Sequence, residues 1–102
     1  MNRNYECSYK QLMKVEWDEV KRQGNLAKHQ VDFVDVQELF DGRPVVTLAS
    51  RHPEEERFLT TGILGGRFYT VNWAWRADVI RLISARRSRD EERRAYRALH
   101  GR

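Results

Sequence analysis

Residues 44–87 alternate between apolar and polar side chains with a period of two, which is the spacing of β-strands that bury one face. Gly65 and Gly66 interrupt the alternation near its middle, and this dipeptide can take the positive φ angles of a tight hairpin turn. The pattern divides into four strand-like runs, PVVTLA, RFLTTGIL, RFYTVNWAW and VIRLISA. We therefore predict an antiparallel meander with a hairpin at the glycine pair.

Helical signals flank this meander on both sides. Asp18 can cap a helix that ends near His29, and Asp32 can cap a second, more apolar helix that ends at Asp41-Gly42. After the strands, Ser88 and Glu91 have the spacing of a capping box for a third helix. MKVEW, residues 13–17, predicts a short first strand. The fold class is therefore α+β, with a central antiparallel sheet, two N-terminal helices and one C-terminal helix.

The length and composition set limits on the organisation of the chain. A chain of 102 residues supports one hydrophobic core, so we expect one domain over residues 13–102 after a polar lead-in at residues 1–12. No apolar run is long enough to cross a bilayer, and the N-terminus lacks the apolar stretch of a secretory signal. Cys7 is the only cysteine, which excludes an internal disulfide. We expect a cytoplasmic protein.

A two-residue turn at the glycine pair fixes the register of the sheet. Leu59 then lies opposite Asn72, and Arg57 lies opposite Ala74. One predicted face carries the apolar residues Phe58, Leu64, Tyr69, Val71, Trp73, Ile80 and Leu82. The other face carries Arg57, Thr61, Thr70, Asn72 and Arg81. The first face is typical of a surface covered by helices, and Phe33, Phe40, Trp73 and Leu82 are expected to be buried together.

Positive charge is concentrated at the C-terminal end of the sequence. Residues 76–102 contain nine arginines and four acidic residues, whereas residues 1–75 contain ten basic and eleven acidic residues. A guanidinium group stays charged and presents a planar fork of donors that fits phosphate oxygens. Nucleic acid is therefore a plausible partner class, and a solvated helix with arginines on its outer face is the alternative.

The first predicted helix gathers further polar groups on one side. Lys21, Asn25, Lys28 and His29 are spaced by three or four residues and so share a helix face. Histidine titrates near neutrality and can transfer protons, although a solvated helix face remains the alternative. The three histidines show no ligand spacing with carboxylates, so we expect no metal and no cofactor.

Three blocks of sequence, taken in order, resemble the BrnT family of bacterial toxins. They are EWDEVKRQGNLAKHQVDF, Arg57 ahead of Gly62, and IRLISARRSRDEERRAY, which together span about residues 15–97. The residues that match the family pattern are Trp17, Asp18, Lys21, Asn25, Lys28, His29, Phe33, Phe40, Arg57, Arg81, Ser84, Arg86, Glu92 and Tyr96. Gly24, Gln30 and Arg89 depart from it, and Gln30 at a helix end is expected to need a positive φ angle.

The resemblance implies a RelE-like fold and a function as a ribonuclease that inhibits translation. It also implies a type II toxin–antitoxin pair with a ribbon-helix-helix antitoxin similar to BrnA. That antitoxin would hold two toxin chains in a heterotetramer and would make the contacts with operator DNA.

Metal-independent cleavage of RNA needs a base for the ribose 2′-hydroxyl, positive charge around the phosphorane and an acid for the leaving 5′-oxygen. We predict Arg57, Arg81, Lys28, His29 and Arg86 as the catalytic residues. We predict Lys21, Asn25, Asn72 and Arg87 as RNA-binding residues, with Glu92 and Tyr96 in support. Strict alternation places Arg86 on the core side unless the strand ends near Ser84. A non-catalytic basic module that binds nucleic acid or an antitoxin remains the alternative.

Overall fold

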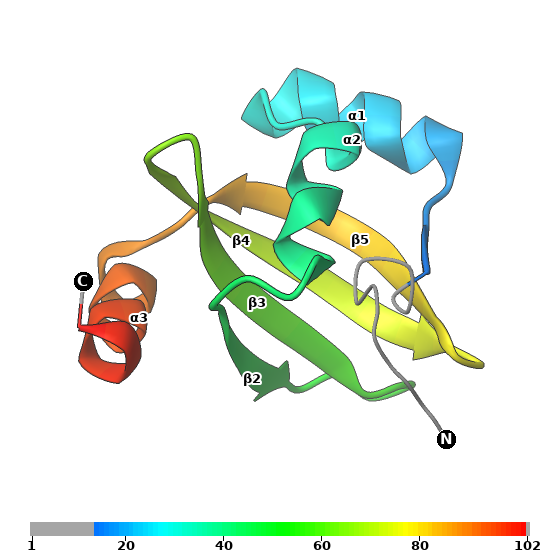
Figure 1. The fold of residues 1–102 in the computed structure, drawn as a ribbon. Helices are drawn as coiled ribbons and strands as arrows, with labels where there is room; N and C mark the ends of the chain where they lie inside the picture. The colour runs from blue at the N-terminus through cyan, green and yellow to red at the C-terminus, as the bar shows by residue number, and fades with distance from the viewer. Residues whose placement is uncertain (1–13, 102) are drawn as a thin grey trace.

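The computed structural model describes residues 14–101 as a five-stranded sheet with three α-helices (Figure 1). The elements in chain order are β1 (Val15–Glu16), α1 (Glu19–His29), α2 (Phe33–Val36), the 3₁₀ turn η2 (Gln37–Phe40), β2 (Val46–Ser50), β3 (Arg57–Leu64), β4 (Arg67–Arg76), β5 (Val79–Arg87) and α3 (Asp90–His100). The predicted lead-in at residues 1–12 lies outside the described residues. Within residues 14–101, no helix combines the length and apolar character needed to span a membrane.

The sheet is mixed, with the strand order β1-β5-β4-β3-β2. Strands β2 to β5 form the predicted antiparallel meander. The prediction of a central antiparallel sheet is confirmed in part, because β1 pairs parallel to β5 through Val15 with Ile80 and Glu16 with Arg81 and so makes the sheet mixed. A strand of two residues carries no periodic signal from which its direction of pairing could be read.

The hairpin between β3 and β4 has the predicted register. Gly65 and Gly66 take φ angles of 56° and 80°, and Leu64 pairs with Arg67 across the turn. The pairing continues without a shift to Arg57 opposite Ala74. The positions of the β3 and β4 side chains on the two faces are therefore confirmed.

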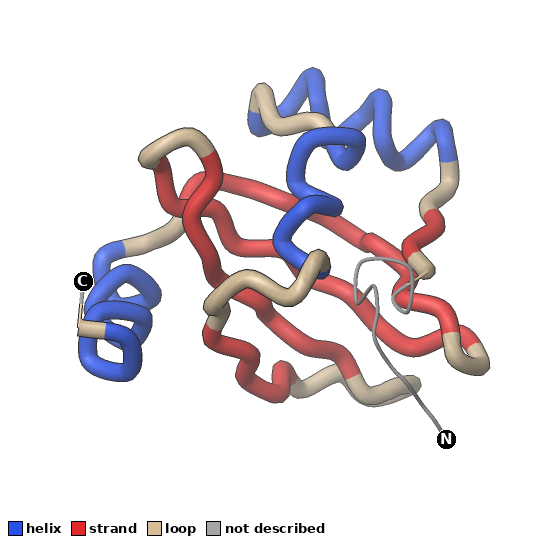
Figure 2. The backbone as a smooth tube through the Cα atoms, in the orientation of Figure 1, coloured by secondary structure: helices blue, strands red, loops and turns tan. Residues whose placement is uncertain are grey.

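The core lies between the sheet and the segment that contains α1 and α2, which Figure 2 shows on the same side of the sheet. Phe33, Phe40, Trp73 and Leu82 belong to one buried cluster, as predicted. The Trp73 ring stacks on Phe58 with centroids 4.7 Å apart and meets Phe40 edge-on at 5.6 Å. Aromatic packing therefore fixes the orientation of this segment on the sheet.

Both predicted aspartate caps are present before the first two helices. The Asp18 carboxylate accepts a hydrogen bond from the Val20 N–H, and Asp32 accepts one from the Val34 N–H. Gln30 ends α1 with a φ angle of 56°, the positive value expected from its sequence position. The second predicted helix is a single α-helical turn, α2, that tightens into η2 before the chain leaves the core.

The start of α3 differs from the prediction. The helix begins at Asp90, and the Glu92 carboxylate accepts the hydrogen bond from the Arg89 N–H, so Ser88 and Glu91 form no capping box. Ser88 is instead buried, with its hydroxyl hydrogen-bonded to Thr70. The reason is that β5 continues to Arg87 and carries the following serine into the space beneath α3.

Candidate active site

A β-bulge in β5 decides which side chains face the open side of the sheet. Trp73 of β4 pairs with Leu82, whereas its neighbour Asn72 pairs with Ser84. Ile83 is therefore an extra residue in β5, and the alternation of faces reverses after it. Arg81 and Arg86 consequently lie on the same face although five residues separate them. The prediction from strict alternation that Arg86 faces the core is wrong because of this bulge.

The face opposite the helical core carries Arg57, Asn72, Arg81, Ser84 and Arg86, which we call the open face. α3 packs over the part of this face formed by the beginning of β4, where Tyr96 meets Phe68 edge-on at 5.3 Å. Asn72 is half-buried opposite Ser84, and its Oδ1 has no hydrogen-bond partner within residues 14–101. The open face thus combines cations with an amide whose oxygen is buried and unpaired among the described residues.

A cavity of about 230 Å³ lies at the end of the open face away from α3. Its lining residues are Lys21, Glu55, Arg57, Ala74, Arg76, Arg81, Leu82 and Ile83. The lining thus contains four basic side chains and one carboxylate. Pockets for drug-sized ligands start at about 300 Å³, so this smaller basic cavity is suited to an anionic group such as a phosphate.

Register explains why two arginines converge on this cavity. Ala74 is the strand partner of both Arg57 and Arg81, so the three residues form one row across β3, β4 and β5. Neighbouring strands are about 4.8 Å apart, which separates the two arginine backbones by about 10 Å. The small side chain of Ala74 leaves the space between them open, and two long side chains can reach a common anion above it.

Carboxylates orient both arginines in this row. Arg57 Nε donates to Glu55 Oε2 at 2.9 Å, and Arg81 Nη1 donates to Glu16 Oε2 at 2.9 Å. The hydrogen bond from Arg57 lowers the pKa of the Glu55 carboxyl below its ordinary value, so this carboxylate is ionised at neutral pH. Within residues 14–101, each arginine uses one nitrogen in these pairs and keeps other N–H donors for a ligand.

Arg86 makes more hydrogen bonds to a carboxylate than Arg57 or Arg81 does. Its Nη1 and Nη2 each donate to a different oxygen of Glu92 at 2.8 Å. Glu92 also accepts hydrogen bonds from the Arg89 N–H at 2.8 Å and from the Thr70 hydroxyl at 3.0 Å. Burial raises the pKa of the Glu92 carboxyl, but these donors outweigh it and bring that pKa to about 2. This bidentate pair joins β5 to the first turn of α3.

The structure gives the other predicted supporting residue, Tyr96, a packing position. Its ring is buried on α3 between Phe68 and His100. His100 in turn hydrogen-bonds the Val45 carbonyl through Nε2 at 3.0 Å. Tyr96 therefore anchors α3 to the sheet and does not line the cavity.

Asn25 is one of the predicted RNA-binding residues, but its amide is occupied within the fold. The residue is 7% exposed, and its Nδ2 donates to the carbonyls of Val31 and Ala85, each at 2.9 Å. Its Oδ1 accepts the Ala85 N–H at 3.0 Å. The side of α1 that the spacing identified faces the edge of β5, so Asn25 joins the helix to the strand.

The remaining predicted residues separate into two groups. Lys21 lies one turn before Asn25 and lines the cavity. Lys28 and His29 lie in the last turn of α1 and are outside the cavity lining. Arg87 follows the bulge and turns to the helix-covered face, where its guanidinium lies 5.6 Å from the centroid of the Tyr69 ring.

Five cavity residues were not identified as site residues from the sequence: Glu55, Ala74, Arg76, Leu82 and Ile83. The predicted register already placed Ala74 opposite Arg57, and Arg76 lies two residues further on the same face, so the register carried a signal for both. Glu55 lies in the loop before β3, where no periodic pattern indicates the direction of a side chain.

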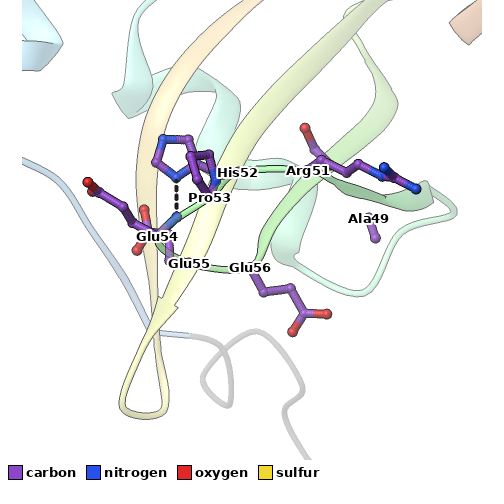
Figure 3. A pocket seen from close by; sticks show the side chains of 8 residues that line it. Ala49, Arg51, His52, Pro53, Glu54, Glu55 and Glu56 are labelled. Atoms are coloured by element: carbon purple, nitrogen blue, oxygen red, sulfur yellow. Dashed lines mark hydrogen bonds between the residues drawn. The ribbon is translucent and has the colours of Figure 1, made fainter.

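A larger cavity of about 720 Å³ lies along the loop between β2 and β3 (Figure 3). Its lining includes Glu54, Glu55 and Glu56 with Arg51 and His52. His52 Nδ1 accepts a hydrogen bond from the Glu54 N–H at 3.3 Å. The excess of carboxylates makes this cavity unsuitable for a phosphate. Residues 14–101 also contain no cluster of three or more His, Cys, Asp or Glu side chains arranged to hold a metal ion.

Comparison with known proteins bears on the function of the open face. No curated protein matches the chain. Residues 17–92 match the model of a family described as the ribonuclease toxin BrnT of a type II toxin–antitoxin system. The matched range covers about three quarters of the chain and contains the whole row of Arg57, Ala74 and Arg81. The chain therefore belongs to the BrnT family of ribonuclease toxins, which act on RNA and are paired with an antitoxin.

Proposed function

We propose that this toxin cleaves RNA without a metal ion, by promoting attack of a ribose 2′-hydroxyl on its own 3′-phosphate in the cavity between Arg57 and Arg81. The observation that carries this proposal is the row of Arg57, Ala74 and Arg81 across three strands, with the basic cavity above its small central residue. A phosphate over Ala74 has a guanidinium on each side. The reaction then inhibits translation by removing intact RNA.

The two arginines stabilise the phosphorane because its negative charge increases on the way to the transition state. Arg57 and Arg81 remain protonated throughout the reaction, and their planar donor groups fit two phosphate oxygens at a time. Their pairs with Glu55 and Glu16 fix the side chains before substrate arrives. Such preorganisation avoids the cost of ordering long side chains during the chemical step.

Proton transfer is assigned to Lys21 and Glu55, which line the same cavity as the two arginines. The ionised Glu55 carboxylate accepts the proton of the 2′-hydroxyl, and the Lys21 ammonium donates a proton to the leaving 5′-oxygen.

Lys28 and His29, which the sequence favoured for these roles, lie near the C-terminal end of α1 and outside the cavity. We therefore expect His29→Gln to retain most of the cleavage rate, and a loss of 100-fold or more would return the role to His29.

Arg86 acts at a distance from the reacting phosphate in this proposal. Both of its Nη groups are committed to Glu92, so it contributes positive potential to the open face and fixes the end of β5. Glu92 is a positioning residue for Arg86.

The substitution Arg81→Lys tests the catalytic part of the proposal. Lysine keeps the charge but loses the bidentate donor group, so the single-turnover rate should fall on the order of 100-fold. Affinity for an RNA whose reactive nucleotide is 2′-deoxy should change far less, because lysine still neutralises a phosphate. Cleavage is measured with excess chelator, and Arg94→Lys on the exposed face of α3 is the matched control.

Two results would contradict the proposal. Cleavage that disappears on chelation and returns with a divalent ion would reject the metal-independent mechanism. Wild-type protein that binds the 2′-deoxy RNA but never cleaves the reactive one, with Arg81→Lys indistinguishable from it, would instead support the non-catalytic binding module.

The proposed antitoxin partner is a small ribbon-helix-helix protein similar to BrnA. A ribbon-helix-helix dimer would carry one toxin on each half, giving a heterotetramer in which the antitoxin alone contacts DNA. The net charge of +4 and the basic open face support a partner segment with acidic residues. Affinity purification from the native host should recover such a protein in equal amount, and a toxin that copurifies with no small protein would contradict this assignment.

A further inference from the structure

We infer that Arg76 forms a second phosphate-binding subsite, which holds the phosphate next to the scissile one and fixes the direction of the RNA along β4. The inference rests on the proposed position of the scissile phosphate above Ala74. It adds a residue outside the family-matching arginine positions, and it assigns to that residue one particular phosphate of the substrate.

Arg76 differs from the other arginines of the cavity in having no carboxylate at ion-pair distance among residues 14–101, although its charge attracts the nearby Glu55 carboxylate. Arg57 is paired with Glu55 and Arg81 with Glu16, whereas Arg76 makes no ion pair or side-chain hydrogen bond within residues 14–101. It is exposed at the end of β4 and lines the cavity. Among the described residues, no acceptor therefore occupies its guanidinium donors, which can bind a ligand.

The spacing along β4 matches that of a nucleic-acid backbone. Arg76 lies two residues beyond Ala74 and so on the same face of the strand. Two residues of a strand span about 6.7 Å, which is comparable with the distance between successive phosphates of a single strand. A phosphate held over Ala74 thus places one of its neighbours beside Arg76.

The opposite direction along β4 offers no equivalent charge. Two residues before Ala74 the same face carries Asn72, a neutral side chain half-buried opposite Ser84. An amide can hydrogen-bond a ribose or a base but cannot neutralise a phosphate. The subsite is therefore one-sided, and only one of the two phosphates that flank the scissile position should depend on Arg76.

Binding of chemically modified RNA tests this inference. A short RNA is prepared with a 2′-deoxy nucleotide at the mapped cleavage position, so that it cannot be cleaved. Two further versions each carry one neutral methylphosphonate, on one or the other side of the scissile phosphate. The nucleotide beside each methylphosphonate is also 2′-deoxy, so that no 2′-hydroxyl can attack it. Affinities are measured for wild type, Arg76→Gln, Arg76→Lys and the control Arg67→Gln. Arg67 suits this purpose because it is also an exposed arginine and lies at the other end of β4.

For wild type, the methylphosphonate at one flanking position should weaken binding roughly 5-fold, as for one partly exposed charge contact. Arg76→Gln should weaken binding of unmodified RNA by a similar factor and should become insensitive to that methylphosphonate. Its dependence on salt should also fall, by about 0.7 in the slope of log affinity against log salt. Arg76→Lys should keep most of the affinity for unmodified RNA. Arg67→Gln should respond to each of the two methylphosphonate RNAs as wild type does.

Two results would overturn the subsite. In one, the loss of binding free energy from Arg76→Gln and the loss from the methylphosphonate at either position are additive, so that Arg76 is not coupled to either phosphate. In the other, Arg67→Gln weakens binding as much as Arg76→Gln, which would indicate only a general effect of net charge. The Arg81→Lys cleavage assay separates these results from failure of the proposed function. A large cleavage defect in Arg81→Lys without coupling at Arg76 rejects the subsite alone, whereas normal cleavage by Arg81→Lys rejects both.

Discussion

The substitution Glu92→Gln should destabilise the protein by an amount that depends on pH. The side chain is 13% exposed and receives donors from Arg86, the Arg89 N–H and Thr70. Glutamine has nearly the same shape but no charge, so it loses the bidentate pair while it keeps one acceptor oxygen. Glu91→Gln is the matched control, because Glu91 lies in the same first turn of α3 and is exposed.

The size of the effect follows from the pKa of Glu92. Folding lowers this pKa from an ordinary value of 4.5 to about 2, and each pKa unit corresponds to about 1.4 kcal/mol. The difference gives about 3 kcal/mol, which partial exposure to solvent reduces to about 2 kcal/mol at neutral pH. For a chain of this length, that loss lowers Tm by on the order of 10 °C.

The sign of the pH dependence is fixed by the same shift. Because the folded-state pKa is lowered, the stabilisation is complete above pH 4.5 and is lost as the pH falls toward 2. Urea unfolding at pH 7, 5 and 3.5 should therefore show the gap between wild type and Glu92→Gln narrowing in acid. A gap of constant size, or an equal loss in Glu91→Gln, would refute the argument.

Three further substitutions have expected outcomes. Gln30→Gly should stabilise the protein by about 1 kcal/mol in urea unfolding, because glycine adopts the φ angle of 56° without strain. Asn25→Leu should cost about 3 kcal/mol through unsatisfied groups of Val31 and Ala85. Asn25→Asp should cost at least as much, because its buried carboxylate would face two carbonyl oxygens that need a donor, and a loss confined to Asn25→Leu would contradict this. Gly62→Ala should lower Tm and cost about 1–2 kcal/mol, since its Cβ would lie 2.7 Å from Leu39 Cδ2 in the packed core.

Much of the sheet could be predicted because local chemistry determines it. The glycine pair fixed the β3–β4 register, and that register correctly separated Trp73 from Arg57. The apolar stripe of the second helical segment likewise identified the core around Phe33. Such patterns can be read from the sequence because the type of turn and the side of a strand that is buried depend on residues that are close together in the chain.

The errors arose where a long-range interaction overrides the local pattern. Nothing in the sequence VIRLISARR marks Ile83 as the extra residue of a bulge, so the faces of Arg86 and Arg87 were exchanged. Asn25 has the spacing of a surface residue, but its partner Ala85 is 60 residues away. The expectation that Arg57 and Arg81 share a face was confirmed, whereas their catalytic roles remain a prediction.

The amide of Asn25 also changes what the sheet can do at its boundary. An unpaired strand edge is a template on which another chain can add, and β1 covers only the beginning of β5. By occupying the N–H and the carbonyl of Ala85, one side chain of α1 takes the place of a missing neighbour strand and blocks such addition there. Among the strands described, the other edge is β2, which spans only five residues. Loss of Asn25 would therefore expose the longer strand to pairing between molecules and so promote aggregation.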